Sequence, residues 1–384
     1  MIVYLSMTTA VILLSILSLS KRERDILCCP AQNGMASRKA LVSTVSTAGI
    51  FTALFLVQAF RINVGNDYAK YVEFMHLARF GSYVPTEPGF NFLAWLTFRL
   101  FGYENFLFCF AVMALITVAG FLFAIDRLSV SFFPGFLMFI TLGYYFQSIN
   151  TVRYYLALAL AACSIYYLLK RDIPRFLLLV VIAACFHKSA LIVLLFYPAA
   201  MMVYKRWHLA ILVCTGALGL ILRPQVLSVM LALYPTYKET GLAAGGEGSL
   251  MSIARCAAVL VLAIILDRGS ILGNRSGEDD DISRRFYCHC NLLALFLYVF
   301  FYYLPVVSRI GYYLTFTHIL YIPALVSRME PGPKKRIATG AVLVVCAVFF
   351  LHTMMHAGDD GFRILPYQTF FFHEMPPILS DTGY

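Results

Sequence analysis

Apolar residues occur along the chain in long runs that are separated by short polar stretches. The runs extend over roughly 15 to 22 residues, the length that an α-helix needs to cross the hydrocarbon core of a bilayer. A window of about 19 residues then predicts twelve membrane-spanning helices. Their approximate bounds are 2–20, 41–60, 105–125, 131–148, 151–169, 174–187, 190–204, 208–222, 250–266, 286–304, 309–327 and 337–355. The pattern therefore predicts an all-α fold, a polytopic transmembrane helical bundle of about 12 spans in a single integral membrane domain, 1–384.

The apolar segment 88–101 departs from this pattern because it is short for a span and contains an arginine. Basic residues gather in the cytoplasmic loops of membrane proteins. If 88–101 crossed the bilayer, the basic clusters at 170–175, 205–206 and 328–336 would face outward. We therefore expect 88–101 to be re-entrant or interfacial, with residues 21–40 in the cytoplasm.

This orientation also assigns the remaining polar segments to the two sides of the membrane. We expect an outer amphipathic or re-entrant segment 61–104, an outer loop 223–249, a cytoplasmic loop 267–285 and an outer C-terminal tail 356–384. The glycine-rich stretch in the outer loop, 245–248, lacks the strand–helix context of a phosphate-binding loop, so we interpret it as a flexible lid. The acidic run in the cytoplasmic loop lies among arginines, which favours a solvated linker over a metal site. Helix 2–20 is followed by basic residues, so we expect it to be retained and not cleaved as a signal peptide.

Composition excludes several classes of protein. Apolar residues make up 61% of the chain and charged residues 13%, whereas soluble domains are about half apolar and a quarter charged. The net charge of +10 does not indicate nucleic acid, because the basic residues cluster in short inter-helix loops. The ten cysteines are scattered, and Cys28-Cys29 and Cys288-His289-Cys290 are too closely spaced for the usual zinc ligands. No disulfide framework or metal site is predicted.

Several arginines stand beside apolar sequence at the outer ends of the predicted helices. An arginine at a helix centre costs about 2.5–3.5 kcal/mol on insertion, so such residues usually face an aqueous or protein-lined cavity. Snorkelling to lipid phosphates is the alternative for any single one. Those that share a similar depth are Arg61, Arg153, Arg309 and either Arg223 or Arg255. Their common depth is the first indication of an outward-facing site.

The longest outer segment contributes two carboxylates to this region. Asp67 follows a turn-forming glycine and asparagine and precedes Tyr68 and Tyr71, whose spacing predicts an amphipathic helix at the interface. Glu87 lies at the membrane boundary, as Arg61 does. Asp67 has a structural alternative as a helix cap or as the partner of Arg61.

Three further clusters of polar and aromatic residues have the same expected depth. They are Gln147, Asn150 and Arg153 followed by Tyr154; His187-Lys188-Ser189; and Arg309 with Tyr312 and Tyr313. In the first cluster, the spacing of three places the side chains near one helix face. A histidine at a helix break, as in the second cluster, is more often a structural hydrogen-bonding group than a catalyst.

The side chains of this region have complementary chemistry. Guanidinium groups bind phosphate oxygens in bidentate fashion, tyrosines suit sugar rings, and a carboxylate or imidazole can accept a proton from an attacking hydroxyl. Glycosyl transfer from a lipid pyrophosphate needs these groups, with arginines stabilising the departing pyrophosphate. On the residues alone, this reaction is one option among several.

Five strings, in this order, resemble the EpsG family of Wzy-type exopolysaccharide and capsular polysaccharide polymerases. They are RINVGNDYAKY (61–71), TEPGF (86–90), NTVRYYLALAL (150–160), CFHKSALI (185–192) and RILPYQTFF (363–371). The resemblance extends from about residue 45 to residue 371. The family pattern falls on Arg61, Gly65, Asp67, Tyr68, Glu87, Gly89, Arg153, His187, Ser189 and Ala190. Asn66 and Tyr154 depart from it, which bears on the choice of substrate.

The resemblance implies a GT-C-like glycosyltransferase in the bacterial cytoplasmic membrane, with its active site facing outward. It implies polymerisation of undecaprenyl-pyrophosphate-linked oligosaccharides on the outer leaflet, without cofactor or metal, alongside a chain-length regulator and a flippase. The implied catalytic residues are Glu87, Asp67, His187 and Arg153. The predicted substrate-binding residues combine the family positions Arg61, Tyr68 and Arg153 with residues expected at the same depth from the sequence pattern, which are Asn150, Tyr154, Arg223, Arg255, Arg309 and Tyr313. The proton acceptor stays open among Glu87, Asp67 and His187.

Two other functions use a similar set of residues. An outward-facing glycan ligase would transfer the same donor to a different acceptor, although such enzymes often carry a larger outer loop than 223–249. A flippase or transporter would show repeated halves with paired interrupted helices, and no such repeat stands out in the sequence.

Overall fold

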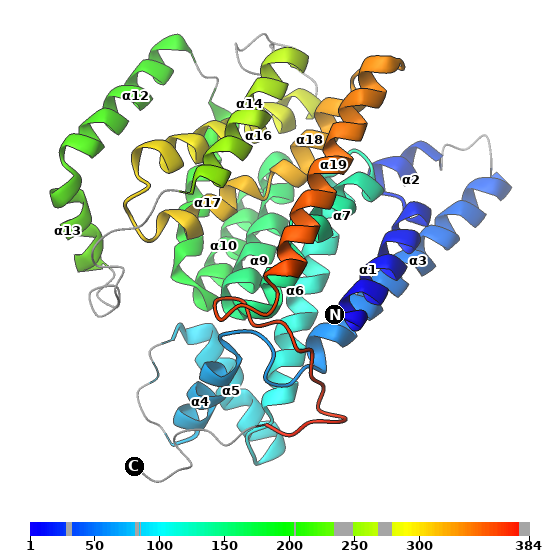
Figure 1. Cartoon of the computed structure of the whole chain (residues 1–384), viewed down its shortest axis with the longest axis vertical. Helices are drawn as coiled ribbons and strands as arrows, with labels where there is room; N and C mark the ends of the chain where they lie inside the picture. The colour runs from blue at the N-terminus through cyan, green and yellow to red at the C-terminus, as the bar shows by residue number, and fades with distance from the viewer. Residues whose placement is uncertain are drawn as a thin grey trace. The chain divides into compact units, whose positions relative to one another are not determined.

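The computed structural model describes residues 1–27, 33–80, 84, 86–202, 205–233, 249–267 and 279–375 (Figure 1). The regular elements within these ranges are helices, which confirms the predicted all-α fold. The helices pack as two compact units, and the single integral membrane domain stays a prediction. The first unit comprises Met1–Tyr167, Ile173–Leu191 and Pro331–Tyr384, and the second comprises Leu168–Asp172 and Ile192–Glu330.

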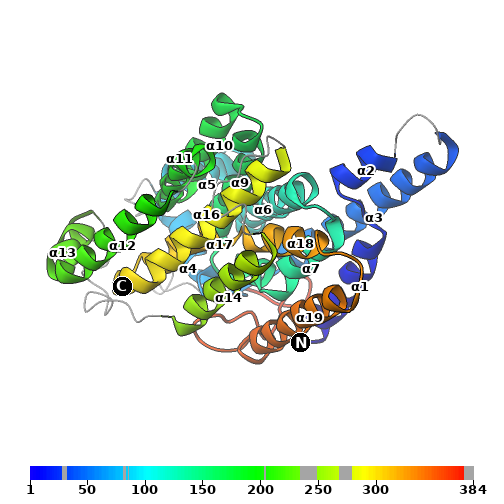
Figure 2. The ribbon, with the colours of Figure 1, turned by 90° about the horizontal axis from the view of Figure 1, so that it is seen from above.

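The first unit contains the N-terminal helices and the last helix of the chain. Its helices are α1 (Ile2–Leu17), α2 (Lys21–Leu27), α3 (Asn33–Ala59), α4 (Tyr68–Arg79), α5 (Pro88–Phe101), α6 (Phe106–Leu128), α7 (Phe132–Thr141), α8 (Tyr144–Asn150), α9 (Val152–Leu169, whose last two residues belong to the second unit), α10 (Ile173–Phe186) and α19 (Pro333–Met355). α3 packs against both α1 and α6, and its contact with α1 is visible in Figures 1 and 2. Their apolar faces bury a core of aromatic and aliphatic side chains.

The second unit is arranged around α16. Its elements are the 3₁₀-helix η2 (Lys188–Leu195, which begins in the first unit), α11 (Phe196–Met201), α12 (Arg206–Ile221), α13 (Arg223–Leu233), α14 (Leu250–Leu266), α16 (Asp279–Phe300), α17 (Val307–Thr315) and α18 (His318–Ser327). α16 packs against α11, α12, α14, α17 and α18. Buried Asn291 on α16 links two of them, since its amide donates to the Cys256 carbonyl and its Oδ1 lies 2.8 Å from His318 Nε2.

Six helices among the described residues are long and apolar enough to cross a membrane, or up to eight if each of two bent pairs forms one span. The six are Ile2–Ile26, Arg38–Ala59, Phe106–Leu128, Val152–Leu169, Val307–Ser327 and Pro333–Met355. The expected count of twelve is therefore not confirmed. The difference has a local cause, because several apolar runs form short or broken helices. The segment Lys188–Met201, for example, divides into η2 and α11, and α12 meets α13 at a bend of 84°.

The segment 88–101 forms the single helix α5, with Pro88 in its first turn and left-handed Gly102 after its last. Its 14 residues span about 21 Å, which is less than the hydrocarbon core of about 30 Å. One face is buried through Phe90, Leu93, Ala94 and Thr97, whereas Phe92 and Trp95 are exposed. The helix is short and has one exposed apolar face; its interfacial or re-entrant placement stays a prediction.

The C-terminal segment, residues 357–373, holds the loop that follows α3. The Ile62 amide donates to the Gln368 carbonyl at 3.0 Å, and the Phe370 amide donates to the Phe60 carbonyl at 3.2 Å. The Gly65 amide donates to the Arg363 carbonyl at 2.8 Å. The described part of the expected outer tail thus packs on the end of α3. Residues 376–384 of this tail, and 234–248 and 268–278 of the two expected loops, lie outside the described residues, as do Cys28 and Cys29.

Gly65 occupies a position where a side chain does not fit. Its φ of +98° belongs to the region that favours glycine, and a Cβ there would lie 2.6 Å from the Ile149 carbonyl oxygen. We predict that Gly65→Ala lowers the free energy of unfolding by about 1–3 kcal/mol in a denaturation titration in mixed micelles.

Gly102→Ala is the matched control, because Gly102 also has a positive φ but no atom within 4 Å of the added Cβ. It should cost less than Gly65→Ala, since only the backbone strain applies. Equal costs for the two variants would contradict the close approach of the loop to α8.

Candidate functional site

An ion pair between Glu87 and Arg153 connects three parts of the first unit. Glu87 immediately precedes α5 in an extended conformation, and Arg153 lies in the first turn of α9. Arg153 Nη1 is 2.5 Å from Glu87 Oε2, and the side chains are 15% and 17% exposed. Glu87 Oε1 also accepts a hydrogen bond from the Lys188 amide at 3.3 Å, where η2 begins. The pair is therefore held from both sides while keeping limited access to solvent.

Aromatic rings support the guanidinium of Arg153. It lies over Tyr71 at 5.2 Å and over Phe90 at 5.6 Å, measured to the ring centroids. Burial raises the pKa of Tyr71 to about 12, with Asp67 adding to the rise, so its hydroxyl stays protonated at neutral pH. That hydroxyl faces Asp67 Oδ2 at 3.5 Å. Asp67 is thus joined to Arg153 through a tyrosine.

Arg153 retains an unused hydrogen-bond donor. Its Nε is buried and has no hydrogen-bond partner among the described residues. A buried donor without a partner costs about 1–3 kcal/mol, so such a group at a partly open position is a candidate for binding a ligand. A guanidinium presents five N–H groups, and Glu87 engages it at Nη1. Arg153 can therefore bind an additional anion.

His187 is positioned by the break between α10 and η2. Its Nδ1 lies 2.6 Å from Ser189 Oγ and accepts the Ser189 amide at 3.4 Å. An Nδ1 that accepts a backbone N–H carries no proton, so the neutral ring has its proton on Nε2. The ring also packs against the edge of Tyr154 at 5.2 Å. The geometry favours hydrogen-bond donation by His187 over proton abstraction.

Three of the predicted substrate-binding residues have structural contacts in the interior. Arg61 has no exposed surface, and its guanidinium donates to the carbonyls of Gln58 and Val64. The Tyr68 hydroxyl donates to the Arg61 carbonyl. Asn150 accepts the Asn66 amide at 2.8 Å and donates to the Gly361 carbonyl at 3.1 Å. Their roles toward substrate stay predictions, whereas the observed contacts hold the loop after α3.

Four further predicted substrate-binding residues belong to the second unit. Arg223 begins α13 and lies over the Tyr303 ring at 5.0 Å. Arg255 Nη2 donates to Thr315 Oγ1 at 3.3 Å. Arg309 and Tyr313 both lie on α17, and Tyr313 is buried. Binding of substrate by these four residues stays a prediction.

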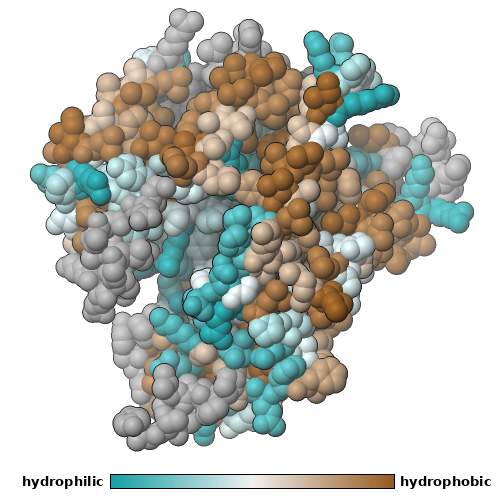
Figure 3. Space-filling view, in the orientation of Figure 1, coloured by the Kyte–Doolittle hydropathy of each residue, from teal (hydrophilic) through white to brown (hydrophobic). Residues whose placement is uncertain are grey.

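A polar pocket at the end of α19 was not predicted from the sequence. It has a cavity volume of about 250 Å³ and is lined by Gln147, His352, Thr353, His356, Asp359, Gly361 and Phe362. The rings of His352 and His356 stack at 4.2 Å, and His356 Nδ1 donates to the His352 carbonyl. In Figure 3, hydrophilic side chains gather at this lower end of α19, below its hydrophobic middle. The four-residue spacing of the two histidines was a sequence signal for this pocket.

Asn150 connects the pocket with the ion pair. It precedes Arg153 by three residues, and its amide holds the carbonyl of pocket-lining Gly361. No group of three or more histidine, cysteine, aspartate or glutamate side chains within the described ranges could hold a metal ion. The site therefore combines one cation–carboxylate pair with a neighbouring polar pocket.

These features define a multi-pass helical membrane protein with a charged site at helix ends. The sequence model of the EpsG family matches residues 48–369, so the chain belongs to the EpsG family. This is a family of Wzy-type polysaccharide polymerases, and membership implies glycosyltransferase-type activity. A comparison with curated proteins found no match, and a comparison with solved structures found none either. The GT-C-like architecture accordingly stays a prediction.

The ion pair should contribute measurably to stability. A double-mutant cycle with Glu87→Gln and Arg153→Gln should give a coupling energy of about 1–3 kcal/mol, because the pair is largely buried and hydrogen-bonded. The measurement is the free energy of unfolding in mixed micelles.

The pair Arg79–Glu104 provides the comparison, since Arg79 is 42% exposed. Its coupling should stay below about 1 kcal/mol. A coupling for Glu87 and Arg153 no larger than this would contradict the described ion pair.

Proposed function

We propose that this protein joins undecaprenyl-pyrophosphate-linked oligosaccharide repeat units on the outer face of the bacterial cytoplasmic membrane. The observation that carries this proposal is Arg153, an arginine held by Glu87 over two aromatic rings with a buried donor still unused. Family membership supplies the reaction class, which is polysaccharide polymerisation. The lipid-linked donor and the roles below are our inference from the site.

Arg153 binds the pyrophosphate of the donor. Its Nε and its remaining N–H groups donate to phosphate oxygens, and the interaction strengthens as negative charge develops on the leaving group. His187, with its proton on Nε2, adds a neutral donor one residue from the amide that binds Glu87. Positive charge at the leaving group thus comes from the protein itself, so the proposed reaction requires no metal.

Glu87 accepts the proton of the attacking hydroxyl. The incoming pyrophosphate competes with the Glu87 carboxylate for Arg153, which frees the carboxylate when the donor is in place. The acceptor oxygen then bonds to the anomeric carbon of the donor while its proton passes to Glu87. The bond from the anomeric carbon to the pyrophosphate oxygen breaks, and undecaprenyl pyrophosphate leaves with the electron pair. Asp67 positions Tyr71 beneath Arg153.

The polar pocket at the end of α19 binds sugar residues of the lipid-linked glycan. Gln147 and Asp359 offer hydrogen-bonding groups to sugar hydroxyls, and the two histidines add a stacked polar wall. Pockets that bind small ligands combine apolar surface with a few convergent polar groups, as this one does through Phe362. Asn150 fixes the distance between this pocket and the leaving-group site.

The charge pattern supports an outward orientation of the site. Arg153 starts α9, whose other end leads into basic Lys170 and Arg171, and the pocket lies at the opposite end of α19 from Lys334 and Lys335. Because basic loops remain in the cytoplasm, the site faces outward. There it receives glycans delivered by a flippase, and a chain-length regulator can act on the product.

Arg153→Ala should abolish polymer formation. Purified protein in nanodiscs, given the lipid-pyrophosphate-linked repeat unit of its host, should produce a ladder on a gel, and this variant should produce none because the leaving group loses its cation. Glu87→Gln should also stop the ladder, and Arg153→Lys should retain weak activity.

Arg99→Ala is the matched control on the same outer face, because Arg99 packs on Trp95 away from the ion pair. It should leave the ladder intact. A full-length ladder from Arg153→Ala would contradict the proposed role, and single transfer to a different acceptor would identify a ligase instead.

Substitutions in the polar pocket should raise KM for the substrate more than they lower kcat. His356→Gln with Asp359→Asn should raise KM for the lipid-linked repeat unit about tenfold, because sugar hydrogen bonds are lost, with a smaller change in kcat. The assay is the initial rate of ladder formation over a range of substrate concentrations.

His373→Gln serves as the control, since His373 also faces the carbonyl four residues earlier but does not line the pocket. Its KM should equal that of the unsubstituted protein. An unchanged KM in the pocket variant would contradict sugar binding there.

A further inference from the structure

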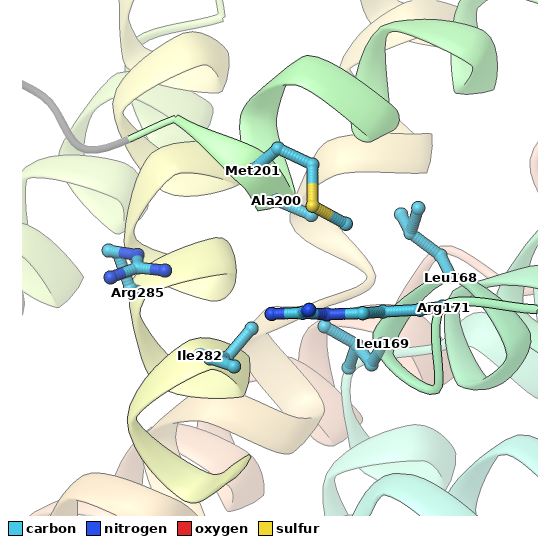
Figure 4. A pocket seen from close by; sticks show the side chains of 7 residues that line it. All are labelled: Leu168, Leu169, Arg171, Ala200, Met201, Ile282 and Arg285. Atoms are coloured by element: carbon cyan, nitrogen blue, oxygen red, sulfur yellow. The ribbon is translucent and has the colours of Figure 1, made fainter. Parts of the chain in front are cut away.

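A second pocket lies within the second unit, formed by the ends of three elements (Figure 4). It has a cavity volume of about 60 Å³ and is lined by Leu168, Leu169, Arg171, Ala200, Met201, Ile282 and Arg285. In Figure 4 the side chain of Arg171 extends across the pocket toward α16, which carries Arg285, and Met201 lies above it. Two cationic groups thus share one pocket with mostly aliphatic walls.

Among the described side chains, these two arginines lack the carboxylate partners that Arg284 and Arg328 have. Neither Arg171 nor Arg285 forms an ion pair with the side chains that the structure describes, and the Nε of Arg285 is buried without a hydrogen-bond partner. The neighbouring carboxylate of Asp267 is already engaged, at 2.5 Å by Arg284 and at 3.7 Å by Arg328. Two like charges facing one pocket repel each other, and a bound anion relieves this repulsion.

The backbone at Arg171 is also unusual. Its φ is +59°, a left-handed conformation that residues with a Cβ adopt rarely. The Arg171 amide donates to the Leu168 carbonyl at 3.0 Å, which closes the turn after α9. Such strained positions cluster at ligand-binding sites. Here the turn places the guanidinium in the pocket.

The sequence assigns all three contributing segments to the cytoplasmic side. The turn at 170–172 and the basic residues 205–206 after α11 have the charge of cytoplasmic loops. The start of α16 follows the expected cytoplasmic loop 267–285. Anionic lipids attract basic residues at this membrane surface, and basic pockets between helices on this side bind phospholipid head groups.

We propose that this pocket binds the phosphate of an anionic phospholipid of the inner leaflet. Arg171 and Arg285 donate to the phosphate oxygens, and Leu168, Leu169 and Ile282 contact the first carbons of the acyl chains. A free phosphate has the same charged chemistry but makes no use of the aliphatic walls. The proposal does not depend on the polymerase reaction.

Lipid binding by the purified full-length protein tests this proposal. Native mass spectrometry in a neutral detergent would compare phosphatidylglycerol with phosphatidylcholine of the same acyl chains. The unsubstituted protein should retain phosphatidylglycerol preferentially, and Arg171→Gln with Arg285→Gln should weaken its apparent affinity about tenfold or more, because charge-assisted hydrogen bonds are lost. Equal retention by both proteins would overturn the proposal.

Two controls separate this site from general charge effects. Arg175→Gln removes a basic residue that follows the same turn but packs on Tyr167, so it should leave lipid binding unchanged. Arg171→Lys with Arg285→Lys keeps the positive charges but removes the paired N–H donors of the guanidinium groups. This variant should bind phosphatidylglycerol several-fold more weakly than the unsubstituted protein. Loss of binding in Arg175→Gln equal to that in the double variant would overturn the proposal. Displacement of phosphatidylglycerol by inorganic phosphate at matched concentration would also overturn it, because the site would then bind free phosphate.

Discussion

The ion pair between Glu87 and Arg153 is the constraint on which the proposed chemistry depends. It joins the start of α5 to the start of α9 and, through the Lys188 amide, to the start of η2. Each of these segments begins beside a polar break in otherwise apolar sequence. A charge in a membrane protein is tolerated where it is paired or faces an aqueous cavity. Pairing thus holds Arg153 at a position where its unused donor can meet a substrate.

A second set of contacts fixes the surroundings of this pair. The C-terminal segment crosses the loop after α3, Gly65 approaches α8, and Asn150 holds both. Buried Arg61 serves the same purpose, because its guanidinium donates to local carbonyls and has no exposed surface. The family motif 61–71, which contains Arg61, therefore supports the site through contacts in the protein interior. The strings that carry the family resemblance are accordingly distant in sequence but joined in the first unit.

The sequence predicted the helical class because this class depends on local patterns of length and hydropathy. The number of spans could not be predicted in this way, since an apolar run does not reveal whether its helix faces lipid or protein. In the span Val152–Leu169, 72% of the most apolar window is buried, whereas the value for Pro333–Met355 is 11%. Both are long and apolar enough to be read as membrane spans, with mean hydropathies of 1.5 and 2.2. Helix breaks such as the one at Gly143 further divide runs that look continuous.

The candidate site was predicted in part. The expected depth in the membrane and the family resemblance pointed to Glu87, Arg153 and His187. The ion pair between Glu87 and Arg153 joins residues 66 positions apart in the sequence, so it follows only from the packing. The histidine pair at the end of α19, His352 and His356, was not predicted, because an apolar helix gives no sign of a pocket beyond the four-residue spacing of these two side chains. The interior position of Arg61 could not be distinguished from exposure at the membrane boundary, since either fits an arginine at a helix end.

Binding of undecaprenyl pyrophosphate to the protein in nanodiscs tests the central claim most directly, because it isolates the leaving-group site from the chemistry. Arg153→Gln should weaken binding at least about tenfold, whereas Glu87→Gln should bind as tightly as the unsubstituted protein or more tightly, since the competing carboxylate is removed. Undiminished binding by Arg153→Gln, or a loss of binding in Glu87→Gln equal to that expected for Arg153→Gln, would contradict the account.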